Sequence, residues 1–326
     1  MLGSYLLKII SYKAMSAMLA IMAALGMITA PSVDTPINII DEENAQLTFI
    51  AWADPQISNY MSDRLGTFEN AVEDVLNSSV KLDALVIAGD IAENGLVSEY
   101  RHMTDRLVKL NDVVDNHIYN FGNHDIRLKA YCIQKDRLID FYNGISQTNK
   151  LDEKLYYSYE VNGYKFIVLN SEKQVFEEAY YSDTQLAWLD SEIASTQESG
   201  KPVFVISHQP FQNTHGLPNT WGSPAFLKGG SMGEQGDAVK AIFEKYNNVI
   251  FLNGHLHVGF GQYTYEDYGA YKSITLPGLC TNNADGYEED GQGYIFEVYE
   301  DQIVARARVF ATGTYLPEYD FTINLK

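Results

Sequence analysis

Short apolar runs alternate with amphipathic stretches through the first half of the chain. Three runs have the length and the aliphatic and aromatic content of buried strands: 47–53, 84–89 and 117–122. Each run is followed by a stretch of helical period: 62–77, about 98–110 and a stretch that ends near Tyr142. Strands and helices that alternate at this spacing predict a largely parallel sheet with helices packed on it.

The pattern changes at residues 156–170, where two β-rich segments flank Asn162-Gly163. This dipeptide is typical of a two-residue hairpin turn, so the segment predicts a β-hairpin. A helix is predicted from Ser182, because Gln185 follows three residues later in a capping-box pattern.

Two further apolar runs predict buried strands, at 202–207 and 248–253. The chain after Gly259 is rich in strand-forming residues, with glycine and asparagine at the turns. Because no repeat, linker or break in composition divides residues 31–326, we expect them to form a single domain.

The first 30 residues have a different pattern from the rest of the chain. Lys8 and Lys13 precede an uncharged apolar run at 14–30, which is the arrangement of an export signal. A buried core helix is the alternative, but the run is apolar on every face and lies at the terminus. Pro31 disfavours cleavage after Ala30, so we predict either a signal peptide or a membrane anchor over residues 1–30, and a secreted or membrane-anchored, extracytoplasmic protein.

Composition excludes several classes of function. The 326 residues include 23 Lys and Arg against 43 Asp and Glu, a formal net charge of −20, and we therefore expect no nucleic-acid binding. A hydrophobic content of 46% is too high for a disordered chain. Cys132 and Cys280 are too few for a disulfide-rich scaffold or a thiolate zinc finger.

Residues of metal-binding type follow five of the predicted strands. They are Asp54 and Gln56, Asp90, Asn123 with His124 and Asp125, His208, and His255 with His257. Since the carboxyl ends of strands in an open α/β sheet face one crevice, we expect these side chains to converge. A carboxylate such as Asp90 can bridge two cations, and imidazole and amide donors suit Mn, Fe or Zn. The pattern predicts a site for two divalent metal ions.

These blocks resemble the calcineurin-like metallophosphoesterase family in order and spacing over roughly residues 47–260. The blocks are Asp54-x-Gln56, Gly89-Asp90-x-x-x-Asn94, Gly122-Asn123-His124-Asp125, His208 and Gly254-His255-x-His257. The resemblance implies an α/β fold, a four-layer α/β/β/α sandwich with two mixed β-sheets. It also implies a metal-dependent hydrolase of phosphoric monoesters or diesters, in which a hydroxide bridging the two metals attacks phosphorus in line.

The resemblance also implies a role for each residue of the blocks. The first metal is held by Asp54, Gln56, Asp90 and His257, and the second by Asp90, Asn123, His208 and His255. His124 stabilises the transition state or protonates the leaving oxygen, and Asp125 orients His124. Gln56 stands where a histidine is usual, so we expect weaker metal binding at the first site and a preference for Mn.

Substrate contacts are predicted from residues 211–236, a connection longer than two adjacent elements require. We expect Phe211, His215 and Trp221 to border the substrate, although a loop without substrate contact fits the sequence equally well. Asn94 either binds a ligand or caps a turn. The expected substrate is a phosphoester, either a small molecule or one derived from a lipid or a wall polymer, and residues 14–30 could attach the chain to a membrane.

Two other classes of function remain open. A metal-stabilised surface protein without turnover would use the same ligands, but it has no need of His124, which favours an enzyme. An intracellular phosphatase would require the apolar run at 14–30 to be part of the fold, and cell fractionation discriminates this alternative.

Overall fold

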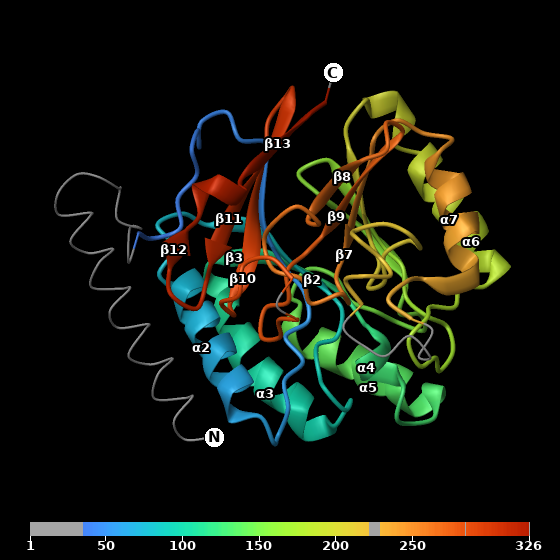
Figure 1. Ribbon diagram of the computed structural model, residues 1–326, viewed down its shortest axis with the longest axis horizontal. Helices are drawn as coiled ribbons and strands as arrows, with labels where there is room; N and C mark the ends of the chain where they lie inside the picture. The colour runs from blue at the N-terminus through green and yellow to red at the C-terminus, as the bar shows by residue number, and fades with distance from the viewer. Residues whose placement is uncertain (1–34, 222–228, 284, 326) are drawn as a thin grey trace.

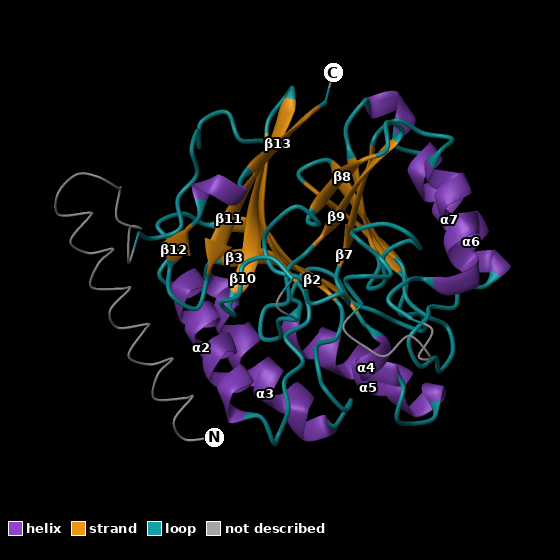
Figure 2. Cartoon of the chain, viewed as in Figure 1, coloured by secondary structure: helices purple, strands orange, loops and turns teal. Residues whose placement is uncertain are grey.

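The computed structural model describes residues 35–221, 229–283 and 285–325. The predicted signal peptide or anchor lies outside these residues, and within them no helix has the length and apolar character that a bilayer crossing requires. Two mixed β-sheets pack face to face, and helices cover the outer side of each sheet (Figures 1 and 2). This arrangement confirms the predicted α/β/β/α sandwich.

The first sheet has seven strands in the order β12-β11-β10-β1-β2-β3, with β13 also paired to β11. Its strands are β1 (Leu47–Trp52), β2 (Leu82–Ala88), β3 (Val114–Asn120), β10 (Gln292–Val298), β11 (Gln302–Val309), β12 (Thr314–Tyr315) and β13 (Phe321–Asn324). Strands β1, β2 and β3 are parallel, as the alternating pattern predicts. The C-terminal strand β10 lies antiparallel beside β1, with Phe296 opposite Phe49, so the end of the chain completes the centre of this sheet.

The second sheet has six strands in the order β4-β5-β6-β7-β9-β8. Its strands are β4 (Tyr157–Val161), β5 (Tyr164–Val168), β6 (Val203–Ile206), β7 (Val249–Asn253), β8 (Tyr265–Asp267) and β9 (Tyr271–Thr275). Strands β5, β6, β7 and β9 are parallel, so their carboxyl ends lie at one edge of the sheet. The predicted hairpin joins β4 to β5, and its turn residues Asn162 and Gly163 have φ of 53° and 76°.

The helices lie on the two outer faces of the sandwich (Figure 1). They are α2 (Ser62–Leu76), α3 (Val97–Leu107), α4 (Asn123–Ile126) and α5 (Tyr131–Ile145) beside the first sheet, and α6 (Asp183–Ala194) and α7 (Gly236–Phe243) beside the second. Short 3₁₀ turns are η1 (Val108–Asp112), η2 (Gln197–Ser199), η3 (Gly233–Gln235) and η4 (Pro317–Tyr319).

Two predicted helix features differ in detail from the structure. The helical stretch expected to end near Tyr142 is two helices, α4 and α5, separated by residues 127–130. Ser182 caps α6 as predicted, and its Oγ accepts a hydrogen bond from the Gln185 backbone N–H at 3.2 Å. The Gln185 side chain does not return to Ser182 but pairs with the backbone of Asn170.

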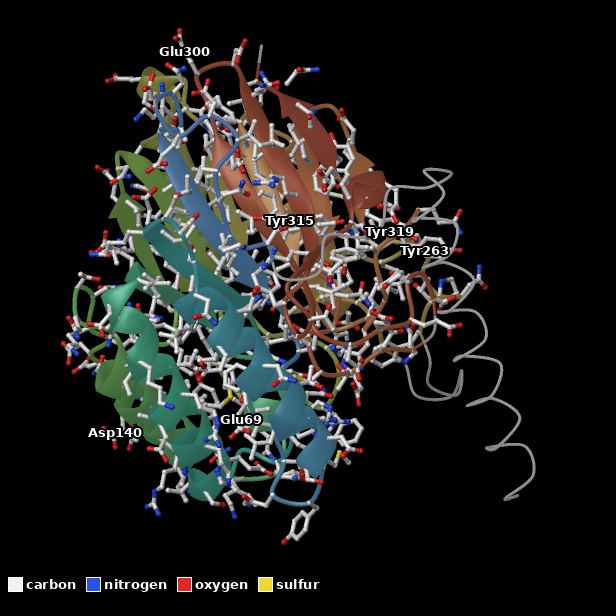
Figure 3. All side chains as sticks on the ribbon, turned by 90° about the vertical axis from the view of Figure 1, so that its left-hand side faces the viewer. Glu69, Asp140, Tyr263, Glu300, Tyr315 and Tyr319 are labelled. Carbon is white, nitrogen blue, oxygen red and sulfur yellow. The ribbon has the colours of Figure 1, made fainter. Side chains whose placement is uncertain are left out.

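Three apolar layers hold the sandwich together. The layer between the sheets centres on Phe49, whose ring contacts Phe166, Phe204 and Phe296 at centroid distances of 4.8–5.4 Å. The other two layers lie between each sheet and its helices. Figure 3 looks onto the outer side of the first sheet, with Glu69 on α2 and Tyr315 in β12.

Candidate metal centre

The predicted metal ligands lie beyond the carboxyl ends of strands from both sheets, two to four residues after the last strand residue. Five of them have backbone φ in the left-handed region: Asp54 (52°), Gln56 (40°), Asp90 (48°), His255 (73°) and His257 (54°). Residues other than glycine rarely adopt this region, and each costs of order 1–3 kcal/mol. Clustered strain of this kind is typical of functional sites, because it turns side chains sharply out of their strands.

Two glycines allow the turns to approach the carboxylates. A Cβ on Gly122 would lie 2.1 Å from Oδ1 of Asp90, and a Cβ on Gly254 would lie 2.6 Å from Oδ2 of Asp54. No side chain fits either position, so the glycines in the Gly-Asn-His-Asp and Gly-His-x-His blocks are sterically required.

The structure brings the candidate donors together as two groups that share one carboxylate. Donor atoms of Asp90, His208 and His255 lie within 4.8 Å of one another, and so do those of Asp54, Asp90 and His257. Nε2 of His208 lies 3.1 Å from both Oδ2 of Asp90 and Nδ1 of His255, and Nε2 of His257 lies 3.3 Å from Oδ1 of Asp54. Asp90 is therefore placed to bridge two ions, as the sequence predicts.

Several polar atoms on the predicted metal ligands are buried without a hydrogen-bond partner. This observation tests whether the residues fit metal ions. These atoms are Oδ1 of Asp54, Oδ1 of Asn123 and Nε2 of His255. Buried polar atoms without a partner are costly unless a ligand compensates them. The orientation of the His208 ring is fixed by a hydrogen bond between its Nδ1 and the Ala88 carbonyl at 2.8 Å. Its other nitrogen, Nε2, faces Asp90 in the site. The donor set fits two divalent cations.

Gln56 also reaches this centre. Its side chain is 2% exposed, and its Nε2 donates to Oδ2 of Asp90 at 3.1 Å. Ligation through the amide oxygen requires a half-turn of the amide group, which exchanges its nitrogen and oxygen at almost the same positions.

The charges of the centre shift the pKa values in opposite directions. Burial favours the neutral form of Asp90, but the imidazoles of His208 and His124 hold the pKa of Asp90 well below its usual range. Burial likewise opposes a charge on His208, yet Asp90 and Asp54 raise the pKa of His208 to about 9. Burial and the adjacent His208 lower the pKa of His255 well below its usual value, so His255 is neutral, the form that binds a metal.

His124 has a different orienting partner from the one predicted. Its Nδ1 lies 2.9 Å from the carbonyl oxygen of Glu93 and 3.2 Å from the Glu93 carboxylate. The carboxylate of Asp125 instead accepts backbone N–H groups of Ile91 and Ala92, at 3.1 and 3.0 Å. Asp125 thus holds the loop that carries Asp90, and Glu93 takes the place expected for Asp125 beside the imidazole.

A cavity of about 280 Å³ opens over these donors. Its lining residues are Asp90, His124, Arg127, Glu177, Trp221, His255, Leu256, His257 and Asn283. Trp221, predicted to border the substrate, is among them, and its ring stacks on that of His255 with centroids 4.6 Å apart. The sequence did not single out Arg127, which falls within the stretch predicted as one helix, or Glu177 and Asn283, which lie in connections between the elements.

The structure does not bring the other predicted substrate residues to this cavity. Phe211 is 2% exposed and packs on Phe243 and Phe251 in the layer between the second sheet and α7. His215 is fully buried, and both of its ring nitrogens are already engaged, with the Tyr263 carbonyl and with Ser273 Oγ, each at 2.7 Å.

Asn94 follows the capping alternative. Its backbone N–H and side-chain amide both donate to the carboxylate of Glu99 at 3.0 Å, which ties the loop after β2 to the first turn of α3.

Comparisons with known proteins agree with this geometry. A 3′,5′-cyclic-nucleotide phosphodiesterase of Nostoc sp. is 25% identical over 181 residues, which are 55% of this chain and 58% of that protein. The chain thus spans less than two thirds of this relative's length.

Two solved structures share the fold. A dimetal phosphatase from Danio rerio superimposes with a TM-score of 0.60 at 17% identity, over 87% of this chain and all of the other. A purple acid phosphatase from yellow lupin gives 0.59 at 13% identity, over 85% of this chain and 53% of the other. The family model of the calcineurin-like phosphoesterases matches residues 47–259, and the chain belongs to this family.

Proposed function

We propose that the protein is an exported, two-metal phosphodiesterase that hydrolyses a small phosphodiester. Membership of the family makes it a hydrolase of phosphoester bonds that uses metal ions. The observation that carries the mechanism is the shared carboxylate: Asp90 belongs to both groups of metal donors.

The ligand assignment adds the amides of Gln56 and Asn123 to the two groups. Asp54, Gln56, Asp90 and His257 would hold one ion, and Asp90, Asn123, His208 and His255 would hold the other. Two bound divalent ions supply an activated water at neutral pH and neutralise charge on the phosphoryl oxygens. The Nδ2 of Asn123 donates to the Phe176 carbonyl at 2.9 Å, and its Oδ1 is buried without a hydrogen-bond partner, which leaves that oxygen available to a metal ion.

His124 serves the leaving oxygen. It lines the cavity beside Asp90, and the Glu93 carboxylate fixes its ring. A cationic imidazole in this position donates a proton to the departing alcohol or stabilises its developing charge. Burial disfavours a charge on His124, but Asp90 and Glu93 outweigh it and raise the pKa of His124 above its usual value, which favours the proton-bearing form.

The Nostoc relative, named for 3′,5′-cyclic nucleotides, supports a diester as the first substrate to test. The full chain is assayed with 3′,5′-cyclic AMP, bis(p-nitrophenyl) phosphate and p-nitrophenyl phosphate, in Mn²⁺, in Zn²⁺ and after chelation. We expect chelator-sensitive hydrolysis that favours a diester and is fastest in Mn²⁺. Two bound metals without hydrolysis of any ester would support the surface-protein alternative, and absence of bound metal would refute the site.

The export component has its own test. The apolar run at 14–30 supports export or membrane attachment, which would give the enzyme access to external nucleotides or to lipid- and wall-derived phosphoesters. Fractionation of expressing cells should place the protein outside the cytoplasm. Recovery in the cytoplasm alone would contradict export and leave the enzymatic proposal intact.

A further inference from the structure

Arg127 lines the catalytic cavity with unused hydrogen-bonding capacity. Its side chain is 17% exposed, and its Nε is buried without a hydrogen-bond partner. The two nearest carboxylate oxygens belong to Glu93 and Glu177, at 3.6 and 3.9 Å, which is too far for hydrogen bonds. A guanidinium in such a place can bind a planar or tetrahedral anion through two N–H groups.

The neighbouring carboxylates are already engaged with other groups. Glu93 lies 2.5 Å from Nη1 of Arg64 and 3.2 Å from Nδ1 of His124. Glu177 accepts a hydrogen bond from Nδ2 of Asn123 at 3.2 Å. The positive charge of Arg127 is therefore only loosely matched by these two glutamates.

Two contacts hold Arg127 at the cavity. Its guanidinium lies 5.7 Å from the centre of the Phe176 ring, a cation–π contact. Its backbone carbonyl accepts a hydrogen bond from the side chain of Gln174. The segment before α6 thus fixes both ends of the residue and leaves its N–H groups beside the cavity.

Position relative to His124 indicates which part of the substrate Arg127 meets. Both side chains lie beside the same oxygen of Glu93, and both line the cavity. If His124 serves the leaving oxygen, Arg127 faces the rest of the leaving alcohol. We propose that Arg127 is a specificity-determining residue that binds an anionic group, a phosphate or a carboxylate, on the leaving part of the substrate. This inference rests on the proposed function, since the role proposed there for His124 identifies the side of the cavity that the leaving alcohol occupies.

Binding of ligands that cannot be hydrolysed tests the proposal without relying on turnover. The Mn²⁺-loaded full chain is titrated by calorimetry with propylphosphonate, 3-phosphonopropionate and propane-1,3-bisphosphonate. We expect at least one of the two doubly anionic ligands to bind about tenfold more tightly than propylphosphonate, the effect of one charge-assisted contact. A gain for 3-phosphonopropionate alone identifies a carboxylate, and a gain for the bisphosphonate alone identifies a phosphate.

Substitutions assign the preference to Arg127. In Arg127→Gln the gain should disappear, while the Kd of propylphosphonate stays within about twofold of the wild type. Arg127→Lys should keep part of the gain in affinity, because it retains the positive charge but not the two-pronged guanidinium. If the glutamine variant does not fold, the lysine variant provides the test. Arg106→Gln is the matched control, since Arg106 pairs with Glu69 on the helical face.

Three results would overturn the inference: equal affinity of the wild type for all three ligands, a preference retained in both Arg127 variants, or an equal loss for all three ligands in Arg127→Gln. The last would show that Arg127 holds the reacting phosphoryl group instead. Because calorimetry needs no hydrolysis, an inactive but ligand-binding protein would refute the proposed function alone.

Discussion

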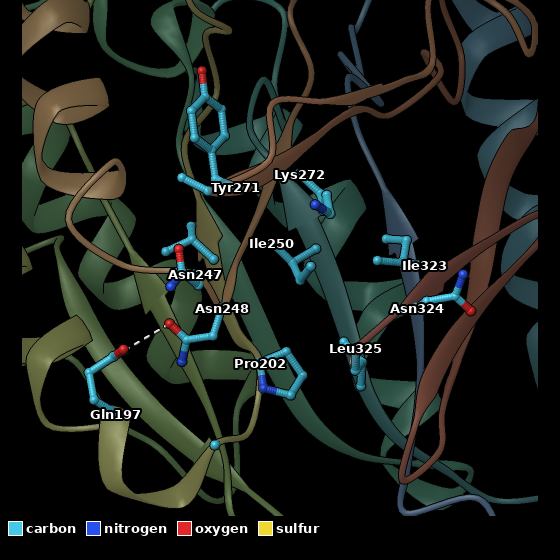
Figure 4. A pocket seen from close by; sticks show the side chains of 13 residues that line it. Gln197, Pro202, Asn247, Asn248, Ile250, Tyr271, Lys272, Ile323, Asn324 and Leu325 are labelled. Carbon is cyan, nitrogen blue, oxygen red and sulfur yellow. Dashed lines mark hydrogen bonds between the residues drawn. The ribbon is translucent and has the colours of Figure 1, made fainter.

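Two cavities of nearly equal volume lie at opposite edges of the second sheet. The catalytic cavity, about 280 Å³, lies beyond the carboxyl ends of β7 and of β2 and β3 from the first sheet, and the other, about 270 Å³, lies where β6, β7 and β9 begin and β13 ends (Figure 4). Strand β7 begins at one cavity and ends at the other, and their volumes do not separate them.

Their polar groups do separate them. At the amino edge, Lys272 is the one charged lining residue among those that the structure describes, and it already donates to Asp267 and to the Gly269 carbonyl at 2.7 and 3.0 Å. Asn248 there accepts from Gln197 at 2.8 Å, the dashed line in Figure 4. Tyr271 also lines this cavity, and its hydroxyl is buried without a hydrogen-bond partner.

At the carboxyl edge, Asp54, Asn123 and His255 each have a metal-binding side chain with a buried, unpartnered atom, and five of the predicted ligands have strained backbone. A cluster of unmatched polar atoms on strained backbone, whose cost a ligand must offset, therefore marks the functional edge.

The largest effect expected is the loss of activity in Asp90→Asn. Removal of the shared carboxylate charge should lower bound metal below two ions per chain and lower kcat/KM by about 10³-fold or more. Metal analysis and hydrolysis of bis(p-nitrophenyl) phosphate measure the two effects.

The matched variant at the other edge is Lys272→Gln, which should change kcat/KM by less than about twofold because it touches no reacting group. If the two variants lose activity equally, the contrast between the cavities is wrong.

The difference between satisfied and unsatisfied polar groups also separates the buried His117 from the histidines of the metal centre, and the pH dependence of stability tests it. His117 is 1% exposed, and its ring nitrogens bond the Tyr119 hydroxyl at 2.5 Å and Oδ1 of Asn111 at 2.8 Å, so it is satisfied when neutral. Burial lowers the pKa of His117 to about 4 from the usual 6.5. The unfolded chain therefore binds the extra proton between these values, and the free energy of unfolding falls as pH decreases from 6.5 to 4, by about 3 kcal/mol in total.

Urea unfolding at pH 7 and pH 4.5 measures this contribution. His117→Gln should be less sensitive to acid than the wild type, and His102→Gln, on α3, should behave as the wild type. An unchanged pH dependence in His117→Gln would show that this histidine is not held neutral.

Glu93→Gln tests which carboxylate orients His124. Loss of the negative charge beside Nδ1 should lower kcat about 10- to 100-fold with little change in KM, because the imidazolium is then less favoured. In a His124→Ala background the same substitution should have almost no further effect, as expected for residues that act as a unit. If the effects of the two substitutions on the activation free energy add in full, Glu93 does not act through His124.

The sequence could predict the metal donors within each sheet from residue type and strand order. Asp54 and Asp90 follow the parallel strands β1 and β2, and His208 and His255 follow the parallel strands β6 and β7, so each pair lies at one edge of its sheet. The packing of the two sheets against each other, which brings the pairs together, does not follow from the strand pattern. Arg127 was not predictable, since the pattern reads as one helix to Tyr142, and the break at 127–130 depends on packing. Aromatic side chains were ambiguous too: Trp221 lines the cavity and Phe211 enters the core, although both belong to the same connection.

The smallest effect concerns Gln56, a predicted ligand whose amide nitrogen donates to Asp90. Because imidazole is the stronger donor for Zn and Fe, Gln56→His should bind Zn²⁺ about tenfold more tightly at one of the two sites and should shift the activity ratio from Mn²⁺ toward Zn²⁺. Metal titration against a chromogenic chelator measures the affinity of each site. The other site, which contains His208 and His255 but not Gln56, is the internal control and should keep its affinity. Unchanged affinity and unchanged metal preference would place Gln56 outside the ligand set and leave its amide as a structural partner of Asp90.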